Sequence, residues 1–212
     1  MPYTIEDWKK RVVSRSDMTS QVVHLTRPTV INGQSSPAID VLMKILAEKK
    51  LIGSSTQSGF ICGERKAVCF QETPLYSLAQ NIYLEQEYRQ QNPSGKVRYH
   101  GVGLTFSKPY VYRKGGRPVI YDRSEEAKKY LPSSEWWRIV SFDLSNDQTI
   151  IDWTHEREWR VPDDFIFDWE ETSIILPSVI AYQEFIKKCQ SVNAFDVLTK
   201  IKGIVNLGAV FF

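Results

Sequence analysis

The sequence has few of the features that mark disulfide-rich or membrane-spanning proteins. It contains only three cysteines, Cys62, Cys69 and Cys189, and no Cys-x-x-Cys pair. An odd number of cysteines without paired spacing is not typical of a disulfide framework or of a zinc ribbon. No run of about 18 apolar residues occurs, and the first residues lack the basic and apolar regions of a signal peptide. We therefore expect a cytoplasmic protein with reduced thiols and no membrane-spanning segment.

An excess of charge of one sign is also lacking. The 27 Lys and Arg residues nearly balance 25 Asp and Glu residues, which leaves a formal net charge of +2. Such a chain has no global field that binds nucleic acid non-specifically, so any basic patch must be local. Hydrophobic residues make up 42% of the 212 residues, which is enough to bury a continuous core.

Repeats, low-complexity tracts and long Pro, Gly or Ser linkers are absent as well. We therefore predict a single α+β domain over residues 1–212. Within it we expect an N-terminal helix that packs on the core (1–20), the core itself (20–162), and C-terminal strand and helices (163–212).

Local patterns predict the elements of this domain. The segment from Thr4 to about Val13 reads as an amphipathic helix with Thr4 as the N-cap, and Ser36 and Pro37 are expected to begin a helix over 38–50. Further helices are expected over 75–90, 124–131, 179–189 and 195–201. Strands are expected over 21–26, 67–70, 99–107, 118–121, 139–144, 158–162 and 173–176, and an apolar tail over 203–212.

The sequence Glu156-Arg157-Glu158 is the first candidate site. Residues two apart on a strand point to the same side, so both carboxylates are expected on one face and Arg157 on the other. Two such acids repel, which tends to raise one pKa into the range useful for a general base. The alternative is a solvated edge in which Arg157 and Arg160 are salt-bridge partners.

A second candidate lies on the first expected strand. His24 interrupts an apolar run, and Thr26 shares its strand face, so an imidazole and a hydroxyl project together beside Arg27 at the strand end. A lone histidine in an apolar run is more often a satisfied core residue, and that alternative stays open.

Other motifs carry weaker signals. Glu72 follows an apolar strand. Its side chain is expected either to reach a cleft from the end of that strand or to have a capping role at the start of the next helix. The loop Gly53–Gly59 lacks the Gly-Lys-Ser/Thr ending of a phosphate-binding P-loop. The histidines lack His-x-x-x-His spacing, so no metal site is predicted.

The order of these residues resembles the ADP-ribosyltransferase fold. The motifs are His24-Leu25-Thr26 on a strand, a helix ending in a Lys-Leu-Ile-Gly turn at Gly53, Val-Cys-Phe-Gln-Glu-Thr-Pro-Leu over 68–75, and the late Glu-x-Glu. The His-x-Thr start is similar to the DarT-like and RNA 2′-phosphotransferase-like branches. The segments His-Gly-Val-Gly-Leu-Thr-Phe, Pro-Val-Ile-Tyr and His-Glu-Arg-Glu-Trp-Arg also resemble the bacterial DUF2971 family and AbiGi-like abortive-infection proteins.

The resemblance, which covers residues 20–162, implies an NAD-dependent enzyme with split mixed and antiparallel sheets and flanking helices. It implies that His24 and Thr26 hold NAD, with Arg27 and Glu72 at the same site, that Glu158 is the catalytic acid, and that Glu156 orients the nucleophile. A carboxylate near the ribose 2′-hydroxyl stabilises the oxocarbenium character that develops when the N-glycosidic bond breaks. The nicotinamide-stacking residue of the family has no clear counterpart, and Phe70, Tyr76 and Tyr83 are the candidates.

Three functions follow as hypotheses. The first is an ADP-ribosyltransferase-like toxin or phage-defence effector that modifies a nucleic acid or a protein. The second is a non-catalytic interaction or immunity module in which the glutamates pair with arginines. The third is a metal-dependent nuclease that uses Asp152, Glu156 and Glu158, although no Lys follows the acidic pair at the usual spacing.

Overall fold

The computed structural model describes residues 2–31, 33–92, 97, 99–192 and 194–210, and it divides the chain into two compact units. Unit 1 comprises residues 1–49, 73–106 and 167–212, and unit 2 comprises residues 50–72 and 107–166. Both contain helices and strands, so the predicted α+β class is confirmed. The single-domain expectation stays a prediction. Among the described helices, none has the length and apolar character needed to cross a membrane.

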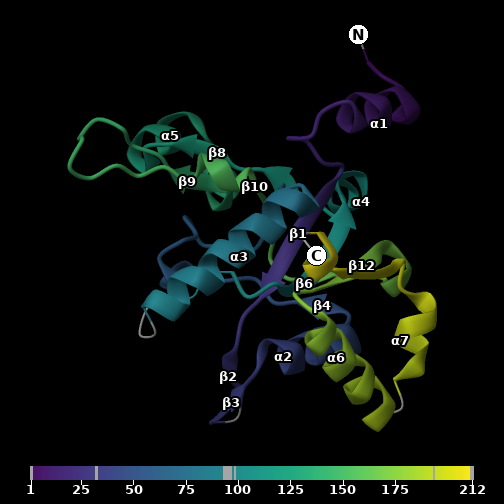
Figure 1. Cartoon of the computed structure of the whole chain (residues 1–212). Helices are drawn as coiled ribbons and strands as arrows, with labels where there is room; N and C mark the ends of the chain where they lie inside the picture. The colour runs from purple at the N-terminus through teal and green to yellow at the C-terminus, as the bar shows by residue number, and fades with distance from the viewer. Residues whose placement is uncertain (1, 32, 93–96, 98, 193, 211–212) are drawn as a thin grey trace. The chain divides into compact units, whose positions relative to one another are not determined.

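Unit 1 is built on a mixed sheet with the strand order β13-β12-β6-β1 (Figure 1). Strand β12 runs antiparallel to β6 and parallel to β13. The strands of the unit are β1 (Gln21–Thr26), β2 (Thr29–Ile31), β3 (Gln34–Ser36), β6 (Val102–Ser107), β12 (Thr172–Leu176) and β13 (Gly203–Asn206). Its helices are α1 (Ile5–Val13), α2 (Ala38–Glu48), α3 (Leu75–Gln91), η4 (Trp169–Glu171), α6 (Val179–Ser191), α7 (Phe195–Lys200) and η5 (Leu207–Val210).

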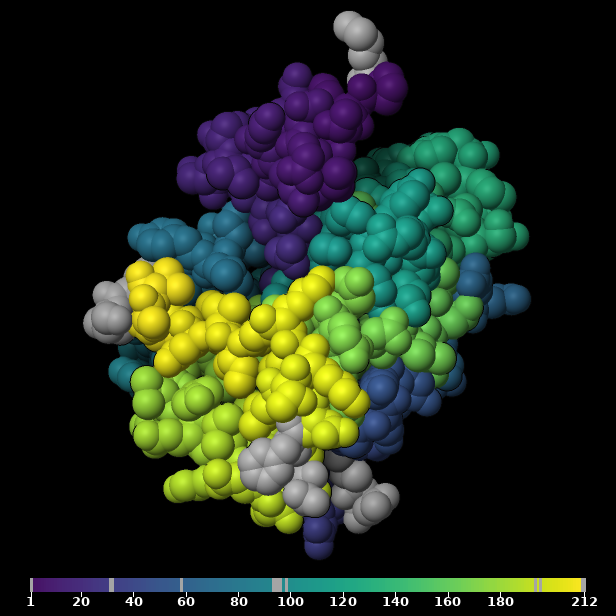
Figure 2. Space-filling view, turned by 90° about the vertical axis from the view of Figure 1, so that its right-hand side faces the viewer, coloured from purple at the N-terminus to yellow at the C-terminus, as the bar shows by residue number. Residues whose placement is uncertain are grey.

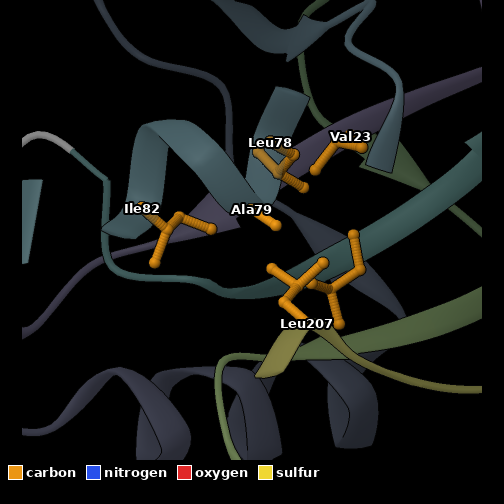
Figure 3. Close-up of a cluster of buried hydrophobic side chains, with 6 residues drawn as sticks. Val23, Leu78, Ala79, Ile82 and Leu207 are labelled. Atoms are coloured by element: carbon orange, nitrogen blue, oxygen red, sulfur yellow. The ribbon is translucent and has the colours of Figure 1, made fainter. Parts of the chain in front are cut away.

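The core of unit 1 lies between helix α3 and the sheet. Leu78, Ala79 and Ile82 recur at helical spacing on α3 and pack with Val23 of β1 and Leu207 of η5 (Figure 3). All five are at most 4% exposed. The C-terminal segment of the unit, yellow in Figure 2, lies at the surface in that view. One face of α3 therefore belongs to the core.

Unit 2 is built on three antiparallel strands in the order β5-β10-β7. In the register of the central pair, Glu158 lies opposite Gln71, and Arg160 lies opposite Cys69. The strands of the unit are β4 (Lys50–Leu51), β5 (Ala67–Gln71), β7 (Arg117–Pro118), β8 (Ile120–Asp122), β9 (Ile139–Ser141), β10 (Glu158–Pro162) and β11 (Phe165–Ile166). Its helices are η1 (Thr56–Ser58), α4 (Lys108–Arg113), α5 (Ser124–Tyr130), η2 (Ser133–Arg138) and η3 (Thr154–Glu156).

Aromatic side chains fill the core of unit 2 on one side of this pair. The ring of Phe165 meets Phe70 edge to face with centroids 5.3 Å apart, and it meets Tyr110 at 6.1 Å. Such edge-to-face pairs stabilise a core beyond the burial of their area. Phe70, proposed by the resemblance as a stacking residue for nicotinamide, is 1% exposed in this cluster.

Most predicted elements are confirmed where local signals are strong. Strands β1 and β10 have the predicted bounds, and Thr4 caps α1 by accepting the Asp7 N–H at 3.1 Å. The predicted cap of α2 is wrong because Ser36 ends strand β3 and Pro37 takes the N-cap position without a side-chain hydrogen bond. The sequence Asn92-Pro93-Ser94-Gly95 predicts the end of helix α3, and its residues 93–95 lie outside the described part of the chain.

Candidate functional site

Strands β5 and β10 give unit 2 two chemically different faces. Side chains alternate along a strand, so Cys69 and Gln71 share a face with their register partners Arg160 and Glu158. The other face carries Phe70 and the aromatic core. The first face is therefore polar inside a largely buried sheet, which identifies it as the candidate site.

An ion pair anchors the polar face. Arg160 Nε donates to Glu158 Oε1 at 2.8 Å, and Nη2 donates to Oε2 at 3.3 Å, so the guanidinium engages both carboxylate oxygens. Arg160 is 3% exposed, and the Glu158 side chain is 15% exposed. Charge-assisted pairs with this bidentate geometry are among the stronger hydrogen bonds in proteins.

The remaining donors of Arg160 bind three backbone carbonyl oxygens that come from two other segments of the chain. Nη1 donates to the carbonyl oxygens of Trp137 at 2.9 Å and Ile139 at 3.0 Å, and Nη2 donates to that of Phe60 at 3.1 Å. A buried guanidinium with this many acceptors fixes the place of the carboxylate that it binds. Arg160 is thus a structural partner of Glu158.

The sequence prediction that Glu156 and Glu158 lie on one strand is wrong. Glu156 ends the 3-10 helix η3, Arg157 adopts a left-handed conformation with φ 42°, and β10 begins only at Glu158. The left-handed residue turns the chain between the two acids, so strand alternation does not apply to them.

Gln71 is nevertheless a neighbour of both glutamates. Its Nε2 donates to Glu156, and its own position in the register is opposite Glu158. The Glu156 side chain is 15% exposed, and His155 Nε2 lies 3.6 Å from it. Gln71 therefore bonds one of the two carboxylates directly and faces the residue that carries the other only through the strand register.

Gln71 also contributes an acceptor that is not used within the described residues. A carboxylate accepts from the amide nitrogen, so the Glu156 contact fixes the orientation of the Gln71 amide. Its Oε1 is buried and has no hydrogen-bond partner among the described residues. Together with two carboxylates, it makes the cluster rich in acceptors and suited to a ligand that carries hydroxyl or amine donors.

Tyr121 of strand β8 completes the cluster. Its phenol oxygen accepts the backbone N–H of Glu158 at 2.8 Å. The pKa of Tyr121 is raised to about 12, chiefly by burial and also by the negative charges of Glu158 and Glu156, against the lowering effect of that N–H bond. The phenol is therefore neutral at physiological pH and keeps its proton beside the two carboxylates.

Cys69 belongs to the same cluster but is not activated. Burial is the largest cause that raises the pKa of the Cys69 thiol far above its ordinary value, and the charge of Glu158 raises it further. Because the thiolate is the nucleophilic form, these surroundings do not favour a nucleophilic role for Cys69.

The opposite face of the two strands holds Glu72 in a separate ion pair. Lys108 Nζ pairs with Glu72 Oε1, and the Trp159 indole N–H donates to Glu72 Oε2 at 2.9 Å. The side chains of Lys108 and Glu72 are only 10% and 14% exposed. Both oxygens of this candidate cofactor-binding residue thus have partners within unit 2.

The remaining predicted residues belong to unit 1. Thr26 is 4% exposed, and its hydroxyl donates to the Val102 carbonyl oxygen at 3.0 Å, with the Ala38 carbonyl 3.4 Å away. His24 is partly buried on the same strand, and Arg27 lies just after its end and is exposed. Their assignment to an NAD site stays a prediction.

Sequence reasoning missed Gln71 and Tyr121 as members of the site. Gln71 is the single polar residue that closes the apolar strand Ala67–Gln71, and Tyr121 closes the Pro-Val-Ile-Tyr segment in the same way. The signal in the sequence that pointed to these two site residues was a polar residue at the end of an apolar strand. The partners of both residues come from pairing between distant segments, which the local pattern does not contain.

Metal ligation is not indicated by the described residues, in which no three His, Cys, Asp or Glu side chains gather as a candidate cation site. Asp152, named in the nuclease hypothesis, accepts from the N–H of Thr154 at 2.8 Å and from its hydroxyl at 2.6 Å. Comparison with protein-family models, with curated proteins and with solved structures gives no match to this chain.

Proposed function

We propose that this chain is an ADP-ribosyltransferase-like enzyme that uses NAD as co-substrate to modify a nucleic acid or a protein. The observation that carries the proposal is the position of Gln71, which donates to Glu156 and lies opposite Glu158 in the strand register at the start of β10. A toxin or phage-defence role, implied by the sequence resemblance, is part of the proposal.

Charge balance supports this chemistry. Arg160 pairs with Glu158, and Glu156, whose side chain is 15% exposed, adds a second carboxylate whose charge acts with that of Glu158 on Tyr121. Fixed negative charge in such surroundings stabilises a positive charge that develops only in the transition state, as at C1′ of the ribose. NAD supplies that electrophilic centre.

Hydrogen bonding supports the same assignment. The Gln71 Oε1 acceptor and the glutamates fit the hydroxyl donors of a ribose, so the residues present are compatible with NAD. In this proposal Glu158, held by Arg160, polarises a ribose hydroxyl, and Glu156 orients the attacking group of the acceptor. Tyr121 keeps the Glu158 backbone in place.

A specific observation favours a second candidate function, the non-catalytic interaction module. Both oxygens of Glu158 are engaged by Arg160, and Arg160 itself holds three backbone carbonyls. A carboxylate that serves only to keep Arg160 in place needs no substrate. If Glu158 has only this structural role, Glu158→Gln changes the free energy of unfolding but does not change the rate of any chemical step.

Nicotinamide release from NAD tests the proposal. The purified chain is incubated with NAD, and nicotinamide is measured for the parent chain, Glu158→Gln, Glu156→Gln and the control Glu125→Gln. Glu125 is 81% exposed and lies in the same unit. The proposal expects release that both site variants lose and the control keeps. Absence of release with any acceptor class, single-stranded DNA, RNA or protein lysate, contradicts it.

A further inference from the structure

His155 lies in a short turn that is fixed on both sides. Before it, the Asp152 carboxylate accepts the N–H of Thr154 at 2.8 Å and its hydroxyl at 2.6 Å. After it, the N–H of Arg157 donates to the Thr154 carbonyl oxygen at 3.1 Å, and the positive φ of Arg157, 42°, ends the 3-10 helix η3. The turn therefore holds the His155 backbone just before Glu158, the first residue of β10.

The imidazole of His155 faces the carboxylate of Glu156. Its Nε2 lies 3.6 Å from Glu156 Oε1, which is an ion-pair distance, while the Gln71 amide donates to Oε2 of the same carboxylate. A carboxylate only accepts hydrogen bonds, so the imidazole nitrogen that faces it carries the hydrogen, and Nδ1 keeps its lone pair. Because the two nitrogens lie on opposite sides of the ring, this lone pair is directed away from Glu156.

The two side chains differ in exposure. The His155 side chain is 58% exposed, whereas that of Glu156 is 15% exposed and has the Gln71 amide on one of its oxygens. A group that arrives from solution therefore reaches the imidazole more readily than the carboxylate. A histidine that a carboxylate orients on one side and that is open on the other has the arrangement of a general base.

Negative charge lies beside this imidazole. The two carboxylates are Asp152, which precedes it, and Glu156, which follows it. The pKa of Asp152 is lowered, chiefly by its hydrogen bonds to Thr154 and in smaller part by the charge of the imidazole. The residue that bonds Glu156 from β5, Gln71, is uncharged, and the phenol of Tyr121 is neutral. The surroundings thus attract the positive charge that the imidazole gains when it takes up a proton.

We propose that His155 is the general base of the transferase reaction and that its Nδ1 takes the proton of the acceptor group. The acceptor is then a hydroxyl or an amine that carries a hydrogen and attacks C1′ of the NAD ribose. This inference rests on the proposed function and deepens it, because neither glutamate supplies the base. Glu158 is engaged by Arg160, and Glu156 orients the attacking group through the imidazole that it faces.

The proposed step needs no further reactant. The bond from C1′ to the nicotinamide nitrogen breaks, and its electron pair returns to that nitrogen, so a neutral nicotinamide leaves. The acceptor oxygen or nitrogen supplies the electron pair of the new bond to C1′, and its proton passes to His155 Nδ1 and then to water. One proton is therefore released for each ADP-ribosyl group transferred.

The dependence of nicotinamide release on pH tests the role of His155. Release is measured at saturating NAD between about pH 5 and 8, the range in which an imidazole gains or loses its proton, with single-stranded DNA, RNA or protein lysate as acceptor. The rate of the parent chain is expected to rise with pH through this range and then to level off. His155→Gln is expected to be at least about 100-fold slower and to lack that rise, and added imidazole is expected to restore part of the rate in His155→Ala.

Two further measurements separate a catalytic role from a structural one. The affinity for NAD, measured by equilibrium dialysis, is expected to stay within about twofold of the parent in His155→Gln, because the base acts only during the chemical step. Acylation of the free chain by diethyl pyrocarbonate, which attacks unprotonated imidazole, is expected to modify His155 with the same pH dependence as nicotinamide release.

His100 supplies the matched control. It is a partly buried histidine of unit 1, outside the candidate site. His100→Gln is expected to keep the rate and the pH dependence of the parent chain. Unfolding in urea confirms that each variant is folded.

Four results overturn the assignment of His155. Three of them leave the transferase proposal intact: release by folded His155→Gln within about threefold of the parent with unchanged pH dependence, an equal loss in His100→Gln, or no acylation of His155. The fourth, no nicotinamide release by the parent chain with any acceptor, overturns the transferase proposal as well. Loss of release in His155→Gln with NAD affinity retained supports the assignment.

Discussion

The phenol oxygen of Tyr121 accepts the backbone N–H of Glu158 at 2.8 Å, so a side chain from β8 fixes the first residue of β10 through its main chain. The side chain of the same residue is fixed independently, because Arg160 engages both carboxylate oxygens. Glu158 is thereby held at its backbone and at its carboxylate. A residue held in this way has little freedom to rearrange, which suits a preorganised catalytic carboxylate.

Tyr121→Phe should change how stability depends on pH. The folded-state pKa of Tyr121 is raised from 10.0 to about 12, mainly by burial. A raised pKa contributes stability that is fully present below pH 10 and is lost as the pH rises toward 12. Urea unfolding across this range should show a smaller decline for Tyr121→Phe than for the parent chain. The control Tyr182→Phe, at a position that is 40% exposed, should decline like the parent. Parallel pH profiles for Tyr121→Phe and the parent contradict the placement of the phenol.

Arg160→Met should destabilise unit 2 strongly. The substitution leaves the poorly exposed Glu158 carboxylate without its counter-charge and removes donors from three carbonyl groups. Breaking a buried pair from one side costs about 3–5 kcal/mol of the free energy of unfolding. Arg157→Met, three residues earlier and exposed, is the matched control and should change stability by less than about 0.5 kcal/mol. A loss below about 1 kcal/mol for Arg160→Met is inconsistent with the described network.

Glu72→Gln distinguishes a structural glutamate from a ligand-binding one. Lys108 loses its charged partner while it stays mostly buried, so a loss of about 3 kcal/mol in the free energy of unfolding is expected. The double variant Glu72→Gln/Lys108→Met should recover a large part of that loss, because no unpaired charge then remains. Unchanged stability combined with weaker NAD binding would assign Glu72 to the cofactor instead.

The thiols should differ in reactivity. Cys189 is fully buried, and burial raises the pKa of both Cys189 and Cys69, so neither is readily available as thiolate. Titration with a chromogenic disulfide at neutral pH should therefore release one fast equivalent, from Cys62, and all three after denaturation. The variant Cys62→Ser should lose the fast phase. A fast phase that persists in Cys62→Ser shows that Cys69 or Cys189 is accessible.

Local elements were predictable where short-range signals determine them. The β-branched run Gln21–Thr26 and the alternation of Glu158–Pro162 predict strands with the observed bounds. Elements that depend on distant partners were not predictable. Helix α4 follows a strand directly, and its N-cap Ser107 accepts the Tyr110 N–H at 3.4 Å, yet no hydrophobic period marks the six residues that form it.

The candidate site was half predictable. The two glutamates stood out as neighbouring acids, but their placement depends on the positive φ of Arg157 and on the register between β5 and β10. The two-residue spacing of the glutamates reveals neither of these features. An arginine in the left-handed region is rare, and strand register depends on residues that are far apart in the sequence. Gln71 and Tyr121 were not predicted as members of the site for the same reason, because long-range pairing places them there.

The central claim is that the carboxylates of Glu156 and Glu158 are catalytic, and nicotinamide release by parallel single-site variants tests it most directly. Glu158→Gln and Glu156→Gln, each shown to be folded by its urea transition, should lower the rate of nicotinamide release at least about 100-fold, whereas Glu125→Gln should leave it unchanged. Rates for both folded site variants within about twofold of the parent chain, a difference well below 1 kcal/mol, would contradict a catalytic role for this cluster.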